Sequence, residues 1–151
     1  MTVIKKLLFA CLLICFGIGT VCNGSVPANE EKMNIRRFAV AFGANNGGQG
    51  RAILRYSISD AQSVLKIMTE MGGVDRKDAF LLENPDRKTL LKKLDNVAKL
   101  VADARGDHRR VEVIFYYSGH SDEKNIMLEE ERVPYAEFRD AINLIDADVR
   151  I

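Results

Sequence analysis

Short apolar runs alternate with segments of helical period along this 151-residue chain, and this alternation restricts the possible folds more than any other feature. The runs are Phe38–Phe42, Ala79–Leu82 and Val113–Tyr117, and the last of them belongs to a predicted strand over Val111–Tyr117. Unbroken apolar runs of this length are typical of strands that are buried on both faces, as in parallel sheets. The order therefore predicts an α/β domain with a mainly parallel sheet, in which right-handed crossovers place helices on both faces.

Three helices are predicted between and after these strands. The first covers Ser59–Met71 and ends at Gly72 and Gly73, where a left-handed residue is expected. For the second helix, Asn84 is the expected N-cap and Pro85 the first helical residue, with the helix ending at Gly106. The third helix is marked by apolar side chains with helical spacing; these are Tyr135, Phe138, Ala141, Ile142 and Ile145.

Two shorter segments complete the pattern. The charged stretch Asn125–Val133 is strand-like, and Val149–Ile151 resembles the opening of a fourth strand. Domains seldom end inside an inner strand, because its neighbour loses a hydrogen-bonding partner. We therefore expect a truncated product or fragment, in which residues 36–151 form an incomplete domain.

The N-terminus has the layout of a secretory signal peptide. Lys5 and Lys6 precede the largely apolar stretch Leu7–Val21, and small residues lead to Ala28. The apolar stretch is shorter than the roughly 20 residues that span a bilayer, so we expect no stable membrane span. The sequence predicts a signal peptide at 1–28, a linker at 29–35, and export into the periplasm or the medium.

Cysteines and charge exclude several functions. Cys11, Cys15 and Cys22 all lie in the predicted signal peptide, so a mature chain has no disulfide, thiolate or sulfur ligand for a metal. The net charge is +1, and no basic stripe with interleaved aromatic residues is present. Nucleic acid is therefore not an expected partner.

The strongest chemical signal follows the third apolar run. In open parallel sheets, sites form beyond the carboxyl ends of the strands. His120 is expected at that edge, where an imidazole serves as a general base, whereas His108 belongs to a polar loop. Seen alone, a histidine after a strand is equally compatible with a surface or capping role.

The stretch Tyr116-Tyr117-Ser118-Gly119-His120 resembles the catalytic-histidine motif of the caspase-like cysteine peptidases, which include caspases and metacaspases (peptidase C14 type). Phe38–Gly43 is similar to the first strand of that family. Leu54–Ala61 resembles the segment leading into its first helix. The resemblance covers residues 36–151, about the first half of the family's catalytic domain, and implies its three-layer α/β/α fold, truncated at the fourth strand.

The resemblance implies a cysteine–histidine endopeptidase site acting on peptides or proteins. His120 would be the catalytic histidine, and the backbone N–H of Gly119 would stabilise the oxyanion. Asp60 and Ser118 match positions that line the pocket for the substrate's P1 side chain, which favours Arg or Lys. Arg55 or Arg51 would instead suit an acidic P1 residue. Asp60 and Arg55 are equally compatible with a helix-capping acid and a solvated cation.

The family's nucleophile follows the fourth strand in an Asp-x-Cys context, and no residue of this chain matches it. The chain alone is therefore expected to be inactive, with the missing C-terminal half of the domain as a possible partner. The alternative is a non-catalytic binding module of the same fold, in which the groove holds a peptide without cleaving it.

Three other readings are weaker. The glycine-rich loop Gly43–Gly50 lacks the Lys and Ser/Thr of a phosphate loop and the last glycine of a dinucleotide fingerprint. Ser118 is too close along the chain to His120 to form a hydrolase pair, and no Gly-x-Ser-x-Gly elbow is present. No cofactor or metal is expected. The acidic residues Asp122, Glu123 and Glu129–Glu131 could attract calcium, but a charged turn is the favoured interpretation.

Overall fold

The computed structural model describes residues 34–151. The predicted signal peptide, nearly all of the predicted linker and the three cysteines lie outside the described residues. Within 34–151, none of the helices has the length and apolar character needed to cross a bilayer.

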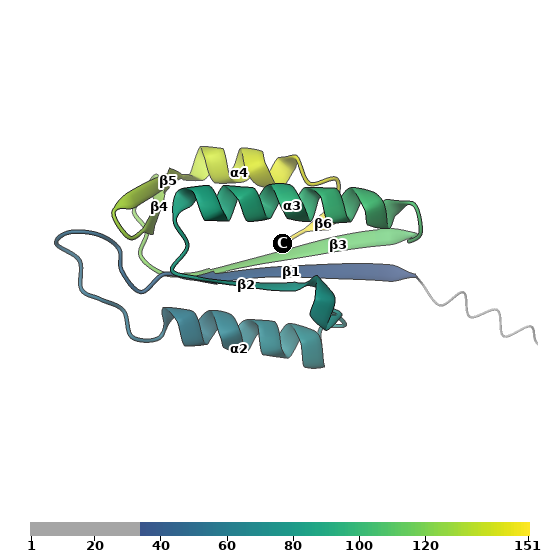
Figure 1. Ribbon diagram of the computed structural model, residues 1–151, viewed down its shortest axis with the longest axis horizontal. Helices are drawn as coiled ribbons and strands as arrows, with labels where there is room; N and C mark the ends of the chain where they lie inside the picture. Colours follow the sequence, from purple (N-terminus) through teal and green to yellow (C-terminus); the bar gives the residue numbers. More distant parts are fainter. Residues whose placement is uncertain (1–33) are drawn as a thin grey trace, which may run out of the picture. The chain divides into compact units, whose positions relative to one another are not determined.

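Strands and helices alternate as the apolar pattern predicts (Figure 1). The elements are β1 (Ile35–Gly43), α2 (Ser57–Glu70), the 3-10 turn η1 (Arg76–Asp78), β2 (Ala79–Glu83), α3 (Arg87–Arg105), β3 (Arg110–Ser118), β4 (Asn125–Leu128), β5 (Glu131–Pro134), α4 (Tyr135–Asn143) and β6 (Val149–Arg150).

The main sheet has the strand order β2-β1-β3-β6, and every neighbouring pair is parallel. Gly43, at the end of β1, is level with Glu83 of β2 and with Ser118 of β3. The carboxyl ends of three strands therefore meet at one edge, where sites form in open parallel sheets. The charged stretch after β3 folds as a separate antiparallel hairpin, β4-β5.

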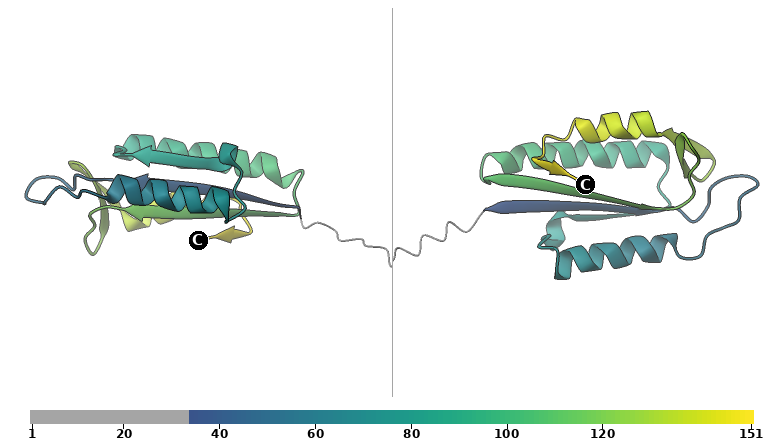
Figure 2. Two further views of the ribbon diagram at one scale, coloured as in Figure 1. Left: turned by 90° about the horizontal axis from the view of Figure 1, so that it is seen from below. Right: turned by 180° about the vertical axis from the view of Figure 1, so that it is seen from behind.

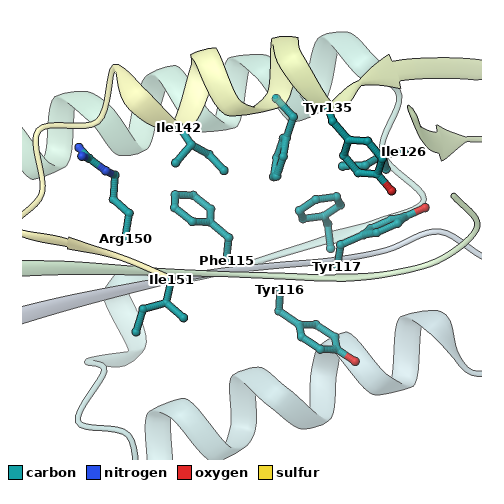
Figure 3. A pocket seen from close by; sticks show the side chains of 10 residues that line it. Phe115, Tyr116, Tyr117, Ile126, Tyr135, Ile142, Arg150 and Ile151 are labelled. Atoms are coloured by element: carbon teal, nitrogen blue, oxygen red, sulfur yellow. The ribbon is translucent and has the colours of Figure 1, made fainter. Parts of the chain in front are cut away.

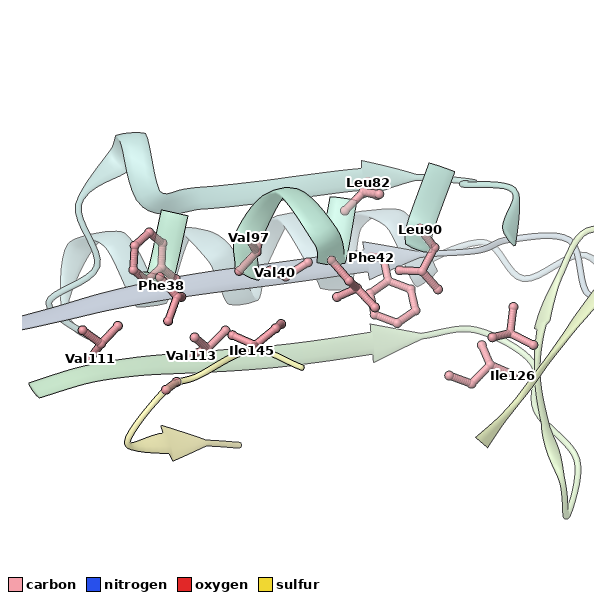
Figure 4. Close-up of a cluster of buried hydrophobic side chains, with 14 of the residues drawn as sticks. Phe38, Val40, Phe42, Leu82, Leu90, Val97, Val111, Val113, Ile126 and Ile145 are labelled. Atoms are coloured by element: carbon pink, nitrogen blue, oxygen red, sulfur yellow. The ribbon is translucent and has the colours of Figure 1, made fainter. Parts of the chain in front are cut away.

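Helices cover both faces of the sheet, with α2 on one side and α3 and α4 on the other (Figures 1 and 2). Alternation along β1 explains the difference between the two faces. Phe38, Val40 and Phe42 are fully buried in the larger core beneath α3 (Figure 4). The opposite face of β1 carries Ala39 and Ala41, which pack with α2 in a smaller cluster.

The close approach of α2 fixes where the helix begins. A Cβ added to Gly43 would lie 2.7 Å from the Cα of Ile58, so only glycine fits at the end of β1. Ser57, the first helical residue, is buried. The predicted start at Ser59 was therefore two residues late, and this contact places the first turn of α2 at the carboxyl edge of the sheet. At the other end, Gly73 has a φ of +70°, which agrees with the expected left-handed residue.

The predicted cap of α3 was wrong. Asp86 is the N-cap, and its side chain accepts a hydrogen bond from the Thr89 N–H at 2.6 Å. Asn84 instead adopts a φ of +42° in the turn after β2. Its side-chain oxygen accepts the N–H of Asn45 at 2.9 Å, and its own N–H donates to the Gly43 carbonyl. Asn84 therefore joins the ends of β1 and β2 through these two hydrogen bonds, and its side chain does not cap α3.

The expected fourth strand is present. Val149 and Arg150 pair with Glu112 and Val113 of β3, and the N–H of Phe115 donates to the Ile151 carbonyl. This pairing places β6 at the side of β3 opposite β1, as the order of the sheet requires.

Candidate active site

His120 lies just beyond the end of β3, at the edge where the strands finish. Its Nε2 atom is 2.7 Å from the backbone carbonyl oxygen of Ala52. A carbonyl oxygen only accepts hydrogen bonds, so Nε2 carries the proton of the neutral ring. The lone pair is then on Nδ1, which makes Nδ1 the basic atom of this site.

The glycine-rich loop between β1 and α2 packs on the imidazole ring. A Cβ added to Gly47 would lie 2.5 Å from the Cγ of His120 and 2.6 Å from its Cβ, so a side chain at this position would displace the ring. The sequence singled out these glycines only as a poor phosphate loop. Their role here is to allow close contact with the histidine.

Hydrogen bonds fasten this loop at several points. The N–H of Ala44 donates to the Ser118 carbonyl at 2.9 Å, and the N–H of Leu54 donates to the Asn45 carbonyl at 2.8 Å. At the hairpin, the N–H of Glu129 donates to the carbonyl of Asn46 at 3.0 Å. The loop is therefore tied to β3 and to the β4-β5 turn, and both ties lie beside the imidazole.

Ser118 and Asp60 meet at the same edge, on the face covered by α2. The Ser118 hydroxyl donates to the Asp60 carboxylate at 3.2 Å, although 58 positions separate the two residues. Asp60 lies in the first turn of α2 and is exposed. None of the described cations forms an ion pair with it, so the carboxylate is available to a positively charged ligand. The two residues that the resemblance assigned to the P1 pocket therefore lie in contact, and their role in P1 recognition stays a prediction.

Gly119 stands between these groups. A Cβ at this position would collide with the Tyr117 hydroxyl, so glycine is required for the turn. Within residues 34–151, no hydrogen bond engages the Gly119 N–H, which leaves it free to donate. Its role toward an oxyanion stays a prediction, since it depends on where a substrate lies.

The arginines suggested for an acidic substrate lie differently. Arg55 is exposed and forms no ion pair or hydrogen bond with another described residue. Arg51 instead lines a cavity at the hairpin with Glu129, Glu130 and Arg132. Neither guanidinium is tied to His120 or Ser118 by a hydrogen bond.

Two of the acidic residues after β3 accept hydrogen bonds from backbone N–H groups. Asp122 accepts the N–H groups of Lys124 and Asn125 at 2.8 Å and 2.7 Å, and these bonds lower its pKa. Glu131 accepts the N–H of Arg87 at 2.7 Å at the start of α3. In the part of the chain that the structure describes, no three acidic, histidine or cysteine side chains are grouped as metal ligands.

A groove of about 440 Å³ runs along β3 beyond the short strand β6 (Figure 3). Its apolar lining comes mainly from β3 and α4; the lining residues are Phe42, Phe115, Tyr116, Tyr117, Ile126, Tyr135, Phe138, Ile142, Arg150 and Ile151. Tyr116 points toward α2, whereas Phe115 and Tyr117 lie on the α4 side of the strand (Figure 3). The groove leads along β3 toward the turn that bears His120.

Comparison with known proteins agrees with this geometry. The model of the caspase domain matches residues 36–149, a range that holds β2, β3 and nearly all of β1, ends at the first residue of β6, and includes His120, Asp60 and Ser118. No curated protein matches the chain. The matched segment covers most of the sequence and has the mainly parallel sheet between helical layers that the resemblance implied. The chain therefore belongs to the caspase-domain family of peptidases (peptidase C14).

Proposed function

We propose that this chain supplies the histidine half of a cysteine–histidine endopeptidase site. The observation that carries the proposal is the 2.7 Å contact between His120 Nε2 and the Ala52 carbonyl. That contact orients the ring and leaves Nδ1 as the base. Nδ1 would accept the proton of a cysteine thiol, and the thiolate would attack the scissile carbonyl. The imidazolium would then return the proton to the leaving amine.

Residues 34–151 contain no cysteine, since the three cysteines of the sequence are Cys11, Cys15 and Cys22. The sulfur nucleophile would therefore come from outside this range. A strand that continues the direction of β6 past Ile151 would run along the open side of β3 toward His120. A thiol at the end of such a strand would reach the edge that bears the imidazole. We propose that an Asp-x-Cys segment fills this place, either in a longer chain or in a second chain.

The substrate is proposed to be a protein or peptide with Arg or Lys at P1. Asp60 offers an exposed carboxylate without a cationic partner among the described residues, and Ser118 adds a hydroxyl 3.2 Å from it. A carboxylate that accepts from a guanidinium or ammonium group gives a strong, charge-assisted hydrogen bond. With a signal peptide at 1–28, the site would act on substrates outside the cytoplasm.

The test is hydrolysis of a fluorogenic peptide with arginine at P1, by a longer form that carries the Asp-x-Cys segment. We expect His120→Ala to abolish turnover and His108→Ala to leave it unchanged, because His108 lies at the end of α3 and contacts Ala104. The 151-residue chain alone is expected to show no turnover. Activity that survives His120→Ala would contradict the proposal. Peptide binding without cleavage by the longer form would instead support the non-catalytic module.

A further inference from the structure

The Tyr117 hydroxyl lies beneath the turn that carries His120. Its oxygen is 2.7 Å from the carbonyl oxygen of His120 and 2.8 Å from that of Met127. With a single proton, the hydroxyl donates to one of the two carbonyls or shares the proton between them. It therefore connects the backbone of the histidine itself to strand β4.

The ring that bears this hydroxyl is held firmly. It packs against Phe42 of β1, with the ring centroids 4.9 Å apart. Burial raises the pKa of Tyr117 to about 12, so the hydroxyl remains a donor at any pH where the protein would work. On the other side, the N–H of Met127 donates to the same His120 carbonyl at 2.9 Å. The His120 backbone is thus fixed from the sheet and from the hairpin together.

We propose that Tyr117 is a positioning residue for His120. Its hydroxyl holds the backbone of the turn that carries His120, and the fixed backbone keeps the imidazole Nε2 in contact with the Ala52 carbonyl. Three contacts then fix the position of the His120 imidazole ring. The Tyr117 hydroxyl bonds to the His120 backbone, Gly47 packs against the ring, and the Ala52 carbonyl contacts Nε2. Without the hydroxyl, the turn can shift and the Nε2–Ala52 bond weakens. The use of this arrangement in catalysis rests on the proposed function, whereas the arrangement itself does not.

The two histidines of the chain allow a direct test by nitrogen-15 NMR of the full chain. We expect Tyr117→Phe to speed solvent exchange of the His120 Nε2 proton roughly tenfold, the factor that corresponds to about one net hydrogen bond. The signals of His108 serve as an internal reference and should not change. Tyr116→Phe is the matched control, since the Tyr116 side chain lies on the α2 side and its hydroxyl bonds to no described residue.

Two further replacements keep the test informative if Tyr117→Phe destabilises the fold. Tyr117→4-aminophenylalanine retains a donor at the same position, and Tyr117→4-methylphenylalanine retains the volume without a donor. The first should leave His120 exchange near that of the unmodified chain, and the second should reproduce the phenylalanine effect. Equal exchange in both, or an equal effect of Tyr116→Phe, would overturn the proposal.

A kinetic measurement separates this inference from the proposed function. In a form that carries the cysteine, Tyr117→Phe should lower kcat while KM is unchanged, because the hydroxyl does not face the P1 side chain. If His120→Ala leaves turnover intact, the proposed function fails, yet the exchange result on His120 stands. If His120→Ala abolishes turnover and Tyr117→Phe changes neither exchange nor kcat, the positioning role alone fails.

Discussion

Gly47 lies so close to His120 that a Cβ added to the glycine would be 2.6 Å from the histidine Cβ. Because real side-chain carbons do not approach this closely, Gly47→Ala must displace either the ring or the loop. We expect this substitution to break the contact between Nε2 and Ala52 and to destabilise the protein by roughly 1–3 kcal/mol, the usual range for overpacking. Chemical denaturation and the NMR signals of His120 would measure the two effects.

Gly106→Ala is the control for this prediction. Gly106 has a φ of −64° and its added Cβ would lie 3.7 Å from the nearest atom, the Asp103 carbonyl oxygen. An alanine fits there without strain, so stability should change little and the His120 signals should stay the same. Similar effects at Gly47 and Gly106 would show that the loop does not confine the imidazole.

The two histidines should hold opposite neutral tautomers. Nε2 of His120 contacts the Ala52 carbonyl, whereas Nδ1 of His108 lies 3.0 Å from the Ala104 carbonyl. Since a carbonyl requires a donor, His120 should carry its proton on Nε2 and His108 on Nδ1. Long-range proton–nitrogen NMR of the neutral rings distinguishes the two forms directly. An Nδ1–H tautomer at His120 would remove the basis for assigning Nδ1 as the base.

The strands and helices could be predicted because their signals are local. Apolar runs and helical periodicity fixed the element order, and small residues after β3 pointed to its carboxyl edge. The contacts that shape the site are not local: Ala52 and Gly47 reach His120 across about 70 residues of sequence. The sequence pattern argued against a phosphate loop, but it did not indicate which residue these glycines contact. Asp60 and Ser118 were linked only by the family resemblance, which assigns both to the P1 pocket, since their spacing of 58 positions alone does not indicate that they meet.

The choice between Asn84 and Asp86 as the cap of α3 shows the same limit. Both residues are good caps, and Pro85 follows Asn84 as it often does at a helix start. Asp86 is the cap because the Asn84 side chain accepts a hydrogen bond from the N–H of Asn45, which lies 39 positions away in the sequence. The residues around Asn84 and Asp86 do not indicate this long-range hydrogen bond, so local sequence could not predict the cap.

Stability should fall at acid pH in a way that Asp148→Asn reduces. A hydrogen bond from the Val111 N–H, 2.7 Å long, is the main cause that lowers the pKa of Asp148, and Arg105 adds to it. A carboxyl group with a lowered folded-state pKa stabilises the protein above its unfolded pKa of about 3.9. That contribution is lost as the pH falls through the folded-state value. Denaturation midpoints between neutral and acid pH should therefore differ less in Asp148→Asn than in the parent chain.

The alkaline side should be governed partly by Tyr117. Its pKa of about 12 lies above the unfolded value of about 10, so the folded state keeps a proton that the unfolded state loses. Stability from this group is complete below the unfolded pKa and is lost as the pH rises through the folded one. Tyr117→Phe should remove this part of the alkaline dependence. The prediction would be contradicted if stability fell equally steeply with pH in parent and variant above about pH 10, the unfolded pKa of tyrosine.

At the far end of the sheet, Asp78→Ala should be strongly destabilising. Asp78 is 2% exposed and accepts two hydrogen bonds of 2.9 Å from the Arg36 guanidinium. Removing the carboxylate leaves a partly buried cation without its partner, which typically costs roughly 3–5 kcal/mol. Asp95→Ala breaks an exposed pair with Lys99 and should cost less than about 1 kcal/mol. Denaturant midpoints compare the two, and equal losses would contradict the argument from burial.

Asp60→Asn tests the specificity of the proposed site. The substitution keeps the size of the side chain and its hydrogen bond from Ser118, but removes the charge that would pair with arginine or lysine at P1. In a form that carries the cysteine, kcat/KM for an arginine peptide should fall roughly tenfold to a hundredfold, as expected for losing a charge-assisted hydrogen bond. A peptide with an uncharged P1 residue should be affected little. Asp103→Asn, an exposed substitution on α3, is the matched control. Equal losses with both peptides would mean that Asp60 supports the fold of the edge instead of reading the substrate's charge.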